Sequence, residues 1–214
     1  MKQNLTERSQ DVPLDVKPEP DSIQDAPVAP RPLVQDTPVF LVGLMGAGKT
    51  TVGKGLARAL DREFLDLDHE LEARCGVKIP VIFEIEGEDG FRKRECQVLD
   101  ECTKKRNIVL ATGGGAVMNP DNRYALKTRG VVVYLRASVD ELHRRTGRDK
   151  NRPLLAKGDP KATLKRLLDL RDPFYREVAD ITVDTGSVSV AALVQQIMSL
   201  LHSSSFKKPC LPST

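Results

Sequence analysis

The sequence predicts an α/β protein, a three-layer α/β/α sandwich built on a five-stranded parallel sheet. Short β-rich segments alternate with longer helical ones, and such alternation requires a parallel sheet covered on both faces. With 214 residues, 40% of them hydrophobic, the chain can bury a substantial core. The expected strands are Pro38–Gly43, Glu63–Leu67, Asn107–Thr112, Val131–Leu135 and Ile181–Asp184. Ligands are expected at the carboxyl ends of these strands.

Helix signals lie between the strands. Ser138 with Glu141 three residues later forms a capping box, and Asn119 before Pro120 supplies an N-cap and a first helical position. Gly130 follows the expected end of that helix. The last helix is expected to bury one face, formed by Val190, Leu193, Val194, Ile197, Leu200 and Leu201.

The two ends of the chain differ in composition from its middle. Residues 1–37 hold six prolines, no aromatic residue, and seven acidic against four basic side chains. Such a segment buries too little apolar surface to offset its ordering entropy, so we expect a disordered extension rather than a docking segment. Its acids also argue against a transit peptide. Residues 38–202 are predicted to form the domain, and residues 203–214 a flexible tail.

Composition excludes several classes of function. The net charge of +3 is far below that of a dedicated nucleic-acid binder. No apolar window is long enough to span a membrane, and the N-terminus has no apolar signal region. The four cysteines form no C-x-x-C pair and no zinc-like spacing with histidine. We therefore expect reduced thiols in a cytoplasmic protein and, given one nucleotide crevice, a monomer.

A complete G-x-x-x-x-G-K-[ST] motif, Gly43 to Thr50, directly follows the first strand. Its glycines let backbone N–H groups surround a phosphate, and Lys49 can reach the β- and γ-phosphates. The strand before it and the helix after it argue against a chance turn and indicate a P-loop NTPase fold. The residues expected to contact ATP are Gly46, Ala47, Gly48, Lys49, Thr50 and Thr51. The motif leaves open whether water or a small acceptor takes the γ-phosphate.

Two carboxylates end the second strand. Asp66 and Asp68 are separated by one residue and so point the same way if the strand alternation continues. Asp66 is expected to support the Mg²⁺ held by Thr50, and Asp68 to orient an acceptor hydroxyl or take its proton. Either acid could instead cap the following helix.

Glycines and arginines complete the expected site. Gly113, Gly114 and Gly115 end the third strand and allow close approach to the backbone, although a plain turn explains them almost as well. Arg171 continues an apolar helical stripe and so faces inward, while Arg92 opens another helix near Glu95. Each arginine could form a structural ion pair, or both could clamp a substrate carboxylate.

The segment Arg144–Leu155 is rich in positive charge and predicts a mobile loop. A solvated charge run is the simplest explanation. A lid that closes over the polyphosphate and excludes water is the alternative, and it favours a small-acceptor kinase over an ATPase.

These motifs, in order and spacing, resemble the shikimate kinase family over residues 38–201. They are Gly43–Thr50, Phe64–Asp68, Gly90–Glu95, Thr112–Ala116, Arg152–Leu155 and Arg171–Tyr175. The resemblance implies transfer of the γ-phosphate of ATP to the 3-hydroxyl of shikimate, on the route to chorismate and aromatic amino acids.

The resemblance also implies individual roles. Thr50 and Asp66 would hold Mg²⁺, and Asp68 with the Gly114 backbone would bind the ring hydroxyls. Arg92 and Arg171 would clamp the carboxylate. Arg145 would pack against the adenine, and Arg152, in the lid, would meet the transferring phosphate.

Two positions depart from the family pattern. Pro80 lies where a helix former is expected and is harmless only in a first turn. Phe174 replaces the commoner leucine. A gluconate-type or nucleoside-monophosphate kinase remains an alternative, but it has no evident use for two arginines facing a carboxylate. A silent relative would be expected to lack Lys49, Asp68 or Arg152, and all three are present.

Overall fold

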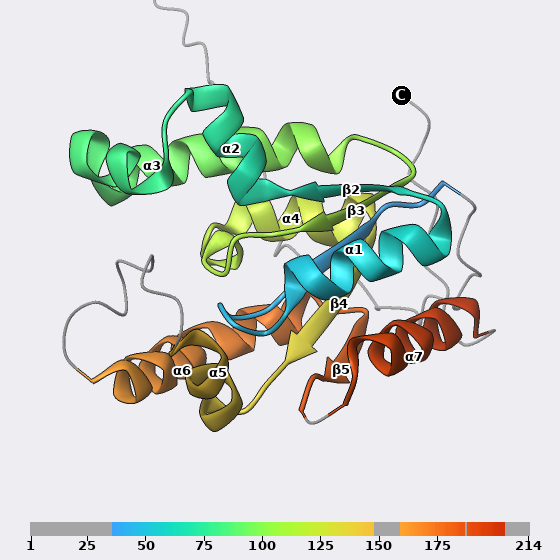
Figure 1. Ribbon diagram of the computed structural model, residues 1–214. Coiled ribbons are helices and arrows are strands. Elements are labelled where there is room, and N and C mark those ends of the chain that lie inside the picture. The colour runs from blue at the N-terminus through green and yellow to red at the C-terminus, as the bar shows by residue number, and fades with distance from the viewer. Residues whose placement is uncertain (1–35, 148–158, 187, 204–214) are drawn as a thin grey trace, which may run out of the picture.

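A five-stranded parallel sheet organises the computed structural model, which describes residues 36–147, 159–186 and 188–203. The strands run in the order β2-β3-β1-β4-β5 (Figure 1). Their bounds are β1 Val39–Val42, β2 Glu63–Asp66, β3 Ile108–Ala111, β4 Val131–Arg136 and β5 Ile181–Asp184. All five strands expected from the sequence are confirmed, with ends that differ by at most one residue.

Helices cover both faces of the sheet, which confirms the three-layer sandwich. Helices α1 and α7 pack together on one face, while α4 packs against α3 and α6 on the other (Figure 1). The helices are α1 Lys49–Leu60, α2 Leu67–Cys75, α3 Ile79–Thr103, α4 Pro120–Arg129, α5 Val139–Thr146, α6 Pro160–Val178 and α7 Val190–His202, with a 3₁₀ turn, η1, at Ala116–Met118.

The pattern of burial follows the position of each strand in the sheet. All four residues of the central strand β1 are completely buried because layers of helices lie on both sides. The edge strand β5 alternates instead, with Ile181 and Val183 buried and Thr182 and Asp184 exposed. The core therefore lies along the central strands and leaves their carboxyl ends free to carry polar groups.

Helix ends follow the predicted signals. The Ser138 hydroxyl accepts a hydrogen bond from the Glu141 amide at 3.3 Å, and the Asn119 side chain accepts one from the Asp121 amide at 2.7 Å. Gly130 follows the end of α4.

The buried face of α7 is narrower than predicted. Leu193, Val194, Ile197 and Leu201 are buried. Val190 and Leu200 are 43% and 36% exposed, so their placement in the core was wrong. Val190 is the first residue of the helix, and Leu200 lies at the margin of the packed face.

Helix α3 clarifies two further expectations. Pro80 lies in its first turn, where proline is tolerated. The helix is interrupted at Gly87, which has φ 69° and ψ −173°. Arg92 therefore lies near the start of the second helical segment, which follows this kink, as the sequence predicted.

The ends of the described chain connect to the core at the amino edge of the sheet. The Asp36 carbonyl accepts a hydrogen bond from the Asn107 amide at 3.0 Å, and Arg62 donates to the Thr37 carbonyl at 2.5 Å. The predicted disorder of residues 1–37 and of 203–214 falls almost entirely outside the described residues. Within those residues, no helix has both the length and the hydrophobicity needed to cross a membrane.

Candidate active site

The P-loop joins β1 to α1. Three of its glycines have positive φ angles, 143° at Gly43, 81° at Gly46 and 95° at Gly48. Residues with side chains rarely adopt such angles, so the glycines allow the loop to curve tightly before α1 begins at Lys49. The Lys49 ammonium lies along this loop and donates to the Gly43 carbonyl at 2.8 Å and to the Leu44 carbonyl at 3.1 Å. The first turn of α1 thus presents N–H groups and a cation to one point, a geometry that suits an anion.

Thr50 and Asp66 come together across this crevice. The Thr50 hydroxyl donates to Asp66 Oδ2 at 2.7 Å. Asp66 Oδ1 also accepts from the Asp68 amide at 3.2 Å and so caps α2. The capping role of Asp66 is therefore confirmed for one oxygen, while the other oxygen is paired with Thr50 and its support of Mg²⁺ stays a prediction. Thr51, also expected at the nucleotide, lies exposed in the first turn of α1.

Asp68 reaches the crevice by a different route from the one predicted. Strand β2 ends at Asp66, so Asp68 lies in the first turn of α2 and not on a continued strand. Asp66 and Ala111 are paired across β2 and β3, which brings Asp68 level with Gly113. Burial raises the pKa of the Asp68 carboxyl, the charge of Asp66 raises it further, and Lys49 lowers it. Asp68 is therefore a half-buried acid within the electrostatic reach of the P-loop lysine.

Arg92 forms the structural ion pair that was one of the two alternatives for it, with the buried Glu95 as its partner. Its Nη1 lies 2.6 Å from Glu95 Oε2, and its Nη2 lies 3.0 Å from Glu88. Glu95 is only 1% exposed, so burial raises the pKa of its carboxyl, while the charge of Arg92 lowers it. Glu95 fixes one side of the Arg92 guanidinium. The available signal was the i, i+3 spacing of Arg92 and Glu95 on one helix.

Two of the three glycines after β3, Gly113 and Gly115, leave space for charged side chains. A Cβ on Gly113 would lie 2.5 Å from Glu95 Oε1 and 3.1 Å from Asp68 Oδ1. A Cβ on Gly115 would lie 2.6 Å from both terminal nitrogens of Arg92. A Cβ on Gly114 would lie 3.8 Å from Arg171 Nη1. Four charged side chains from three helices, Asp68, Arg92, Glu95 and Arg171, therefore surround this turn, which is more than a plain strand-to-helix connection needs.

Arg171 faces inward, as its position in the helical stripe predicts. It is 6% exposed, and its Nε has no hydrogen-bond partner among the described residues. A buried guanidinium with an unpaired nitrogen is costly unless it meets an anion. The free-energy cost therefore points to an anionic ligand between Arg171 and the glycine turn.

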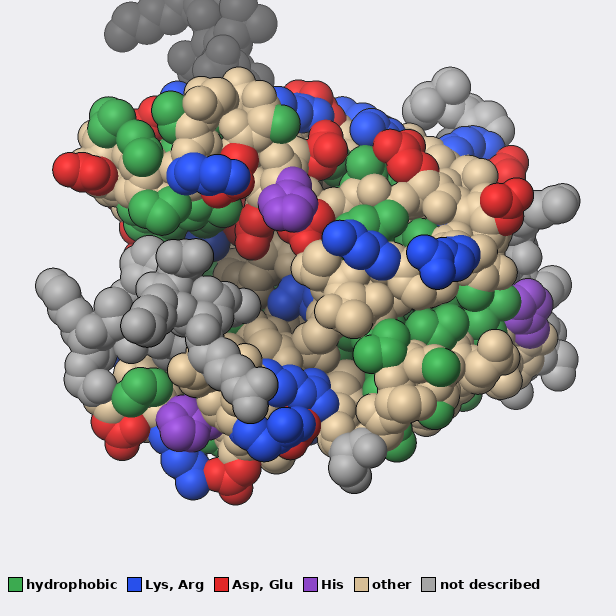
Figure 2. Space-filling view, viewed as in Figure 1, with side chains coloured by type: hydrophobic (Ala, Val, Ile, Leu, Met, Phe, Trp, Pro, Cys, Tyr) green, Lys and Arg blue, Asp and Glu red, His purple; other side chains and the backbone are tan. Residues whose placement is uncertain are grey.

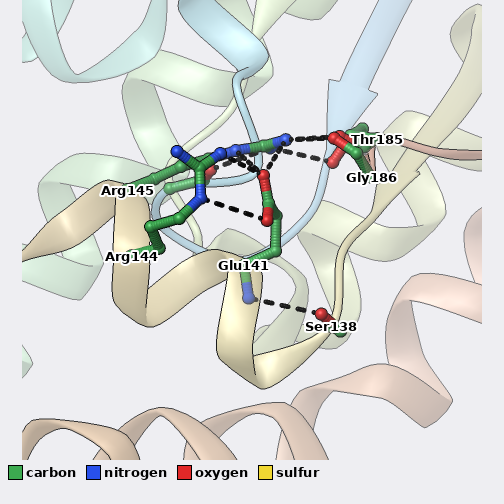
Figure 3. Close-up of polar contacts among 7 residues, drawn as sticks. Ser138, Glu141, Arg144, Arg145, Thr185 and Gly186 are labelled. Carbon is green, nitrogen blue, oxygen red and sulfur yellow. Dashed lines mark hydrogen bonds and ion pairs between the residues drawn. The ribbon is translucent and has the colours of Figure 1, made fainter. Parts of the chain in front are cut away.

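Arg145 lies at the end of α5, beside the P-loop. It donates to the Thr185 hydroxyl at 3.0 Å, to the Thr185 carbonyl and to the Gly186 carbonyl at 2.8 Å. Its Nε donates to Glu141 at 3.0 Å, and Glu141 also pairs with Arg144 (Figure 3). This cluster joins α5 to the turn between β5 and α7.

The lid prediction is corrected in part. Arg144, Arg145 and Thr146 belong to α5 and not to a loop, because Glu141 pairs with both arginines along the helix. Arg152 and the rest of the expected lid lie outside the described residues.

The surface is hollowed where these elements meet. Figure 2 shows acidic side chains along one margin of the hollow and Lys or Arg side chains on its floor and opposite margin. The P-loop, Asp68 and the glycine turn all lie at the carboxyl edge of the sheet. A P-loop at this edge of a parallel sheet, facing a turn lined by two arginines, defines a P-loop kinase.

Comparison with known proteins specifies the family. The shikimate kinase family model matches residues 45–202. A shikimate kinase of Bordetella pertussis is 64% identical over 178 residues, which cover 83% of each chain. The chain belongs to the shikimate kinase family.

Solved structures give the same result. A shikimate kinase from Acinetobacter baumannii in complex with shikimate matches with a TM-score of 0.75 and 54% identity, over 77% of this chain and 92% of that one. A gluconokinase from Sinorhizobium meliloti matches with a TM-score of 0.51 and 18% identity, over 77% of this chain and 91% of that one. The second likeness shows a shared fold alone.

Proposed function

We propose that this chain transfers the γ-phosphoryl group of ATP to the 3-hydroxyl of shikimate, giving ADP and shikimate 3-phosphate. The observation that carries this proposal is the convergence of Arg92, Arg171 and Asp68 on one glycine turn beside the P-loop. Two guanidinium groups suit a carboxylate, and an acid at the same turn suits a hydroxyl. Shikimate bears both groups on one ring.

The nucleotide binds at the P-loop. Backbone N–H groups at Gly46, Ala47 and Gly48 and the start of α1 surround the β-phosphate, and Lys49 moves from its carbonyl contacts to the β- and γ-phosphates. Thr51 lies next to them in the same helical turn and contacts the α-phosphate side. Arg145 contacts the adenine at the turn after β5. Arg152, in the lid, meets the transferring phosphate.

Mg²⁺ fits the Thr50 and Asp66 pair. The hydroxyl and carboxylate oxygens are hard ligands, they already lie 2.7 Å apart, and Mg²⁺ in kinases takes few protein ligands besides phosphate and water. When bound, the ion supplies charge neutralisation at the polyphosphate. Asp66 retains its cap of α2 through its other oxygen, so the ligand oxygen stays oriented.

Shikimate binds across the glycine turn. Arg92 and Arg171 hold the carboxylate, and the backbone from Gly113 to Gly115 approaches the ring closely because it carries no side chains. Glu95 keeps the Arg92 guanidinium oriented through their 2.6 Å contact.

Asp68 aligns the acceptor for in-line transfer. The 3-hydroxyl oxygen forms a bond to the γ-phosphorus, the bond between that phosphorus and the β–γ bridging oxygen breaks, and ADP leaves. The hydroxyl proton passes to the Asp68 carboxylate. The raised pKa of Asp68 makes it a better proton acceptor than an exposed aspartate. Lys49 and Arg152 stabilise the charge that develops on the phosphoryl oxygens.

We also propose that the enzyme is a cytoplasmic monomer without a nucleic-acid or membrane partner. The balanced charge of the sequence argues against a nucleic-acid partner.

The test is a coupled ADP-release assay with shikimate, gluconate and AMP as parallel acceptors in the presence of Mg²⁺ and ATP. We expect rapid turnover with shikimate and background rates with gluconate and AMP. Conversion of gluconate or AMP without conversion of shikimate would assign the acceptor site to a different kinase. No turnover with any acceptor would indicate a silent relative.

A further inference from the structure

A tyrosine on α6 is bonded to the glycine turn from behind. Tyr175 is completely buried, and its hydroxyl donates to the Gly114 carbonyl at 2.5 Å across 61 positions of sequence. Gly114 is the middle residue of the turn to which the acid and the two arginines converge. A single hydrogen bond thus ties the turn to α6.

Arg171, on the same helix, also influences this hydroxyl electrostatically. Burial raises the pKa of Tyr175, while the charge of Arg171 and a hydrogen bond from it lower the pKa. Arg171 lies one helical turn before Tyr175, and its Nη1 lies 3.8 Å from where a Cβ of Gly114 would be. Tyr175 and Arg171 therefore reach the same turn residue from one helix, and Tyr175 does so through a hydrogen bond to the Gly114 carbonyl.

The ring that carries this hydroxyl is held in place. It stacks on Tyr134 with the ring centroids 5.0 Å apart and the planes at 30°. The Tyr134 hydroxyl donates to Asp172 at 2.8 Å, and the other oxygen of Asp172 accepts from Arg176 at 2.5 Å. Tyr134 and Asp172 line a separate cavity of about 490 Å³, with Arg136 and Asp184 among its other walls. The Tyr134 hydroxyl therefore bonds away from the glycine turn, whereas that of Tyr175 bonds toward it.

We propose that Tyr175 is a positioning residue for the acceptor, because its hydroxyl fixes the distance between the Gly114 backbone and the Arg171 guanidinium. The inference rests on the proposed function, since it assigns Tyr175 to the shikimate half of that site. Without this hydroxyl, the partly buried Gly114 carbonyl loses its donor, and the turn is no longer tied to the helix that carries Arg171. The shikimate carboxylate would then meet an Arg171 side chain and a Gly114 backbone whose separation is no longer fixed.

The test compares two variants that each remove one hydroxyl from the same stacked pair, Tyr175→Phe and Tyr134→Phe. Both retain the ring and the stack. Shikimate binding is measured by calorimetry without nucleotide, KM for shikimate and for ATP by ADP release, and the unfolding midpoint by thermal denaturation.

For Tyr175→Phe we expect the Kd and KM for shikimate to rise about tenfold, because the variant loses roughly one hydrogen bond. KM for ATP should stay within about twofold of wild type. For Tyr134→Phe we expect shikimate binding within about twofold of wild type, even if the unfolding midpoint falls. Unchanged shikimate binding in Tyr175→Phe, or equal rises in both KM values, would overturn the inference.

A double-variant cycle tests the link to Arg171. If Tyr175 acts through Arg171, the combined Tyr175→Phe and Arg171→Lys changes weaken shikimate binding by less than the product of the single effects. A simple product would show independent action and overturn the proposal. If wild-type protein neither binds nor phosphorylates shikimate, the proposed function fails as well. If wild type does both, only the Tyr175 inference is at stake.

Discussion

Two glycine-rich turns lie at the carboxyl edge of the sheet, and they use glycine for different physical reasons. In the P-loop, Gly48 has a φ of 95°, and a Cβ there would meet nothing closer than 3.8 Å. In the turn after β3, Gly115 has an ordinary φ of −99°, but a Cβ there would lie 2.6 Å from the Arg92 guanidinium. Gly48 is needed for its positive φ angle, whereas Gly115 is needed to leave space for the Arg92 side chain.

The difference reflects how each half of the site is built. The nucleotide half is largely one continuous segment, Gly43 to Thr50, whose shape depends on its own backbone angles. The acceptor half is assembled from the start of α2, the middle of α3, the turn after β3 and the end of α6. Its shape depends on contacts between side chains that are distant in sequence. Changes in the two halves should therefore have separable effects on ATP and on shikimate.

The largest effect is expected where the halves meet, at Asp68. Asp68→Asn should lower kcat by about 100- to 10,000-fold while KM for ATP stays near wild type, because the acceptor loses its proton acceptor and not its nucleotide. Steady-state ADP release measures both constants. A variant with wild-type turnover would exclude Asp68 from the chemistry.

Asp68 also predicts a dependence on pH. The folded-state pKa is raised, so the folded protein favours the protonated acid, and the ionised acid costs stability above that pKa. Wild-type kcat/KM should therefore fall as the pH drops through this raised pKa. Asp68→Asn should unfold at a higher temperature than wild type at neutral pH, with the advantage shrinking in acid. A lower midpoint at neutral pH would contradict the assigned direction.

The next effect is expected at Arg171 and should concern shikimate alone. Arg171→Lys keeps the charge but loses the planar fork, so KM for shikimate should rise by about 10- to 100-fold, with KM for ATP little changed. Initial rates with each substrate varied in turn give both values. Equal effects on the two constants would make Arg171 a structural residue and weaken the separation of the two halves.

Matched glycine variants test the comparison of the two turns directly. Gly48→Ala forces a residue with a side chain into positive φ and should lower the free energy of unfolding by about 1–3 kcal/mol while weakening ATP binding. Gly115→Ala strains no backbone angle and displaces only the flexible end of Arg92. It should leave the free energy of unfolding nearly unchanged and raise KM for shikimate by about tenfold. Urea unfolding and steady-state kinetics distinguish the two variants. If Gly115→Ala lowered the free energy of unfolding and Gly48→Ala affected only KM for shikimate, the assigned difference between the two turns would be wrong.

The smallest effect is expected at Glu141, which orients Arg145 on the nucleotide side. Glu141→Gln removes the charge that holds Arg145 at 3.0 Å, but four further contacts of Arg145 with Gly46, Thr185 and Gly186 remain. KM for ATP should rise about two- to fivefold, since a single ion pair near the surface contributes up to about 1 kcal/mol. Arg144→Gln, which removes the other partner of Glu141, is the control and should change neither KM. A change in KM for shikimate without a change in KM for ATP would contradict the placement of Glu141 in the nucleotide half.

Some acceptor residues could be predicted from the sequence, and others could not. The stripe on α6 predicted that Arg171 faces inward, and its burial confirms this. Asp68 was expected in the crevice by strand alternation, yet it arrives there from the first turn of a helix. Glu95 was named only as a neighbour of Arg92, although the two lie three residues apart on one helix. Tyr175 was not assigned a role, because the carbonyl that it bonds lies 61 residues away.

The sequence by itself determined the five strands, the P-loop, the capped helices and the family. Each of these depends on residues within a few positions of one another, where backbone angles and periodicity decide the outcome. Only the tertiary structure decided that Asp66 serves both Thr50 and α2, that four charged side chains surround one glycine turn, and that Tyr175 ties that turn to α6. Those contacts depend on strand register and helix packing, which bring together side chains that no local pattern relates.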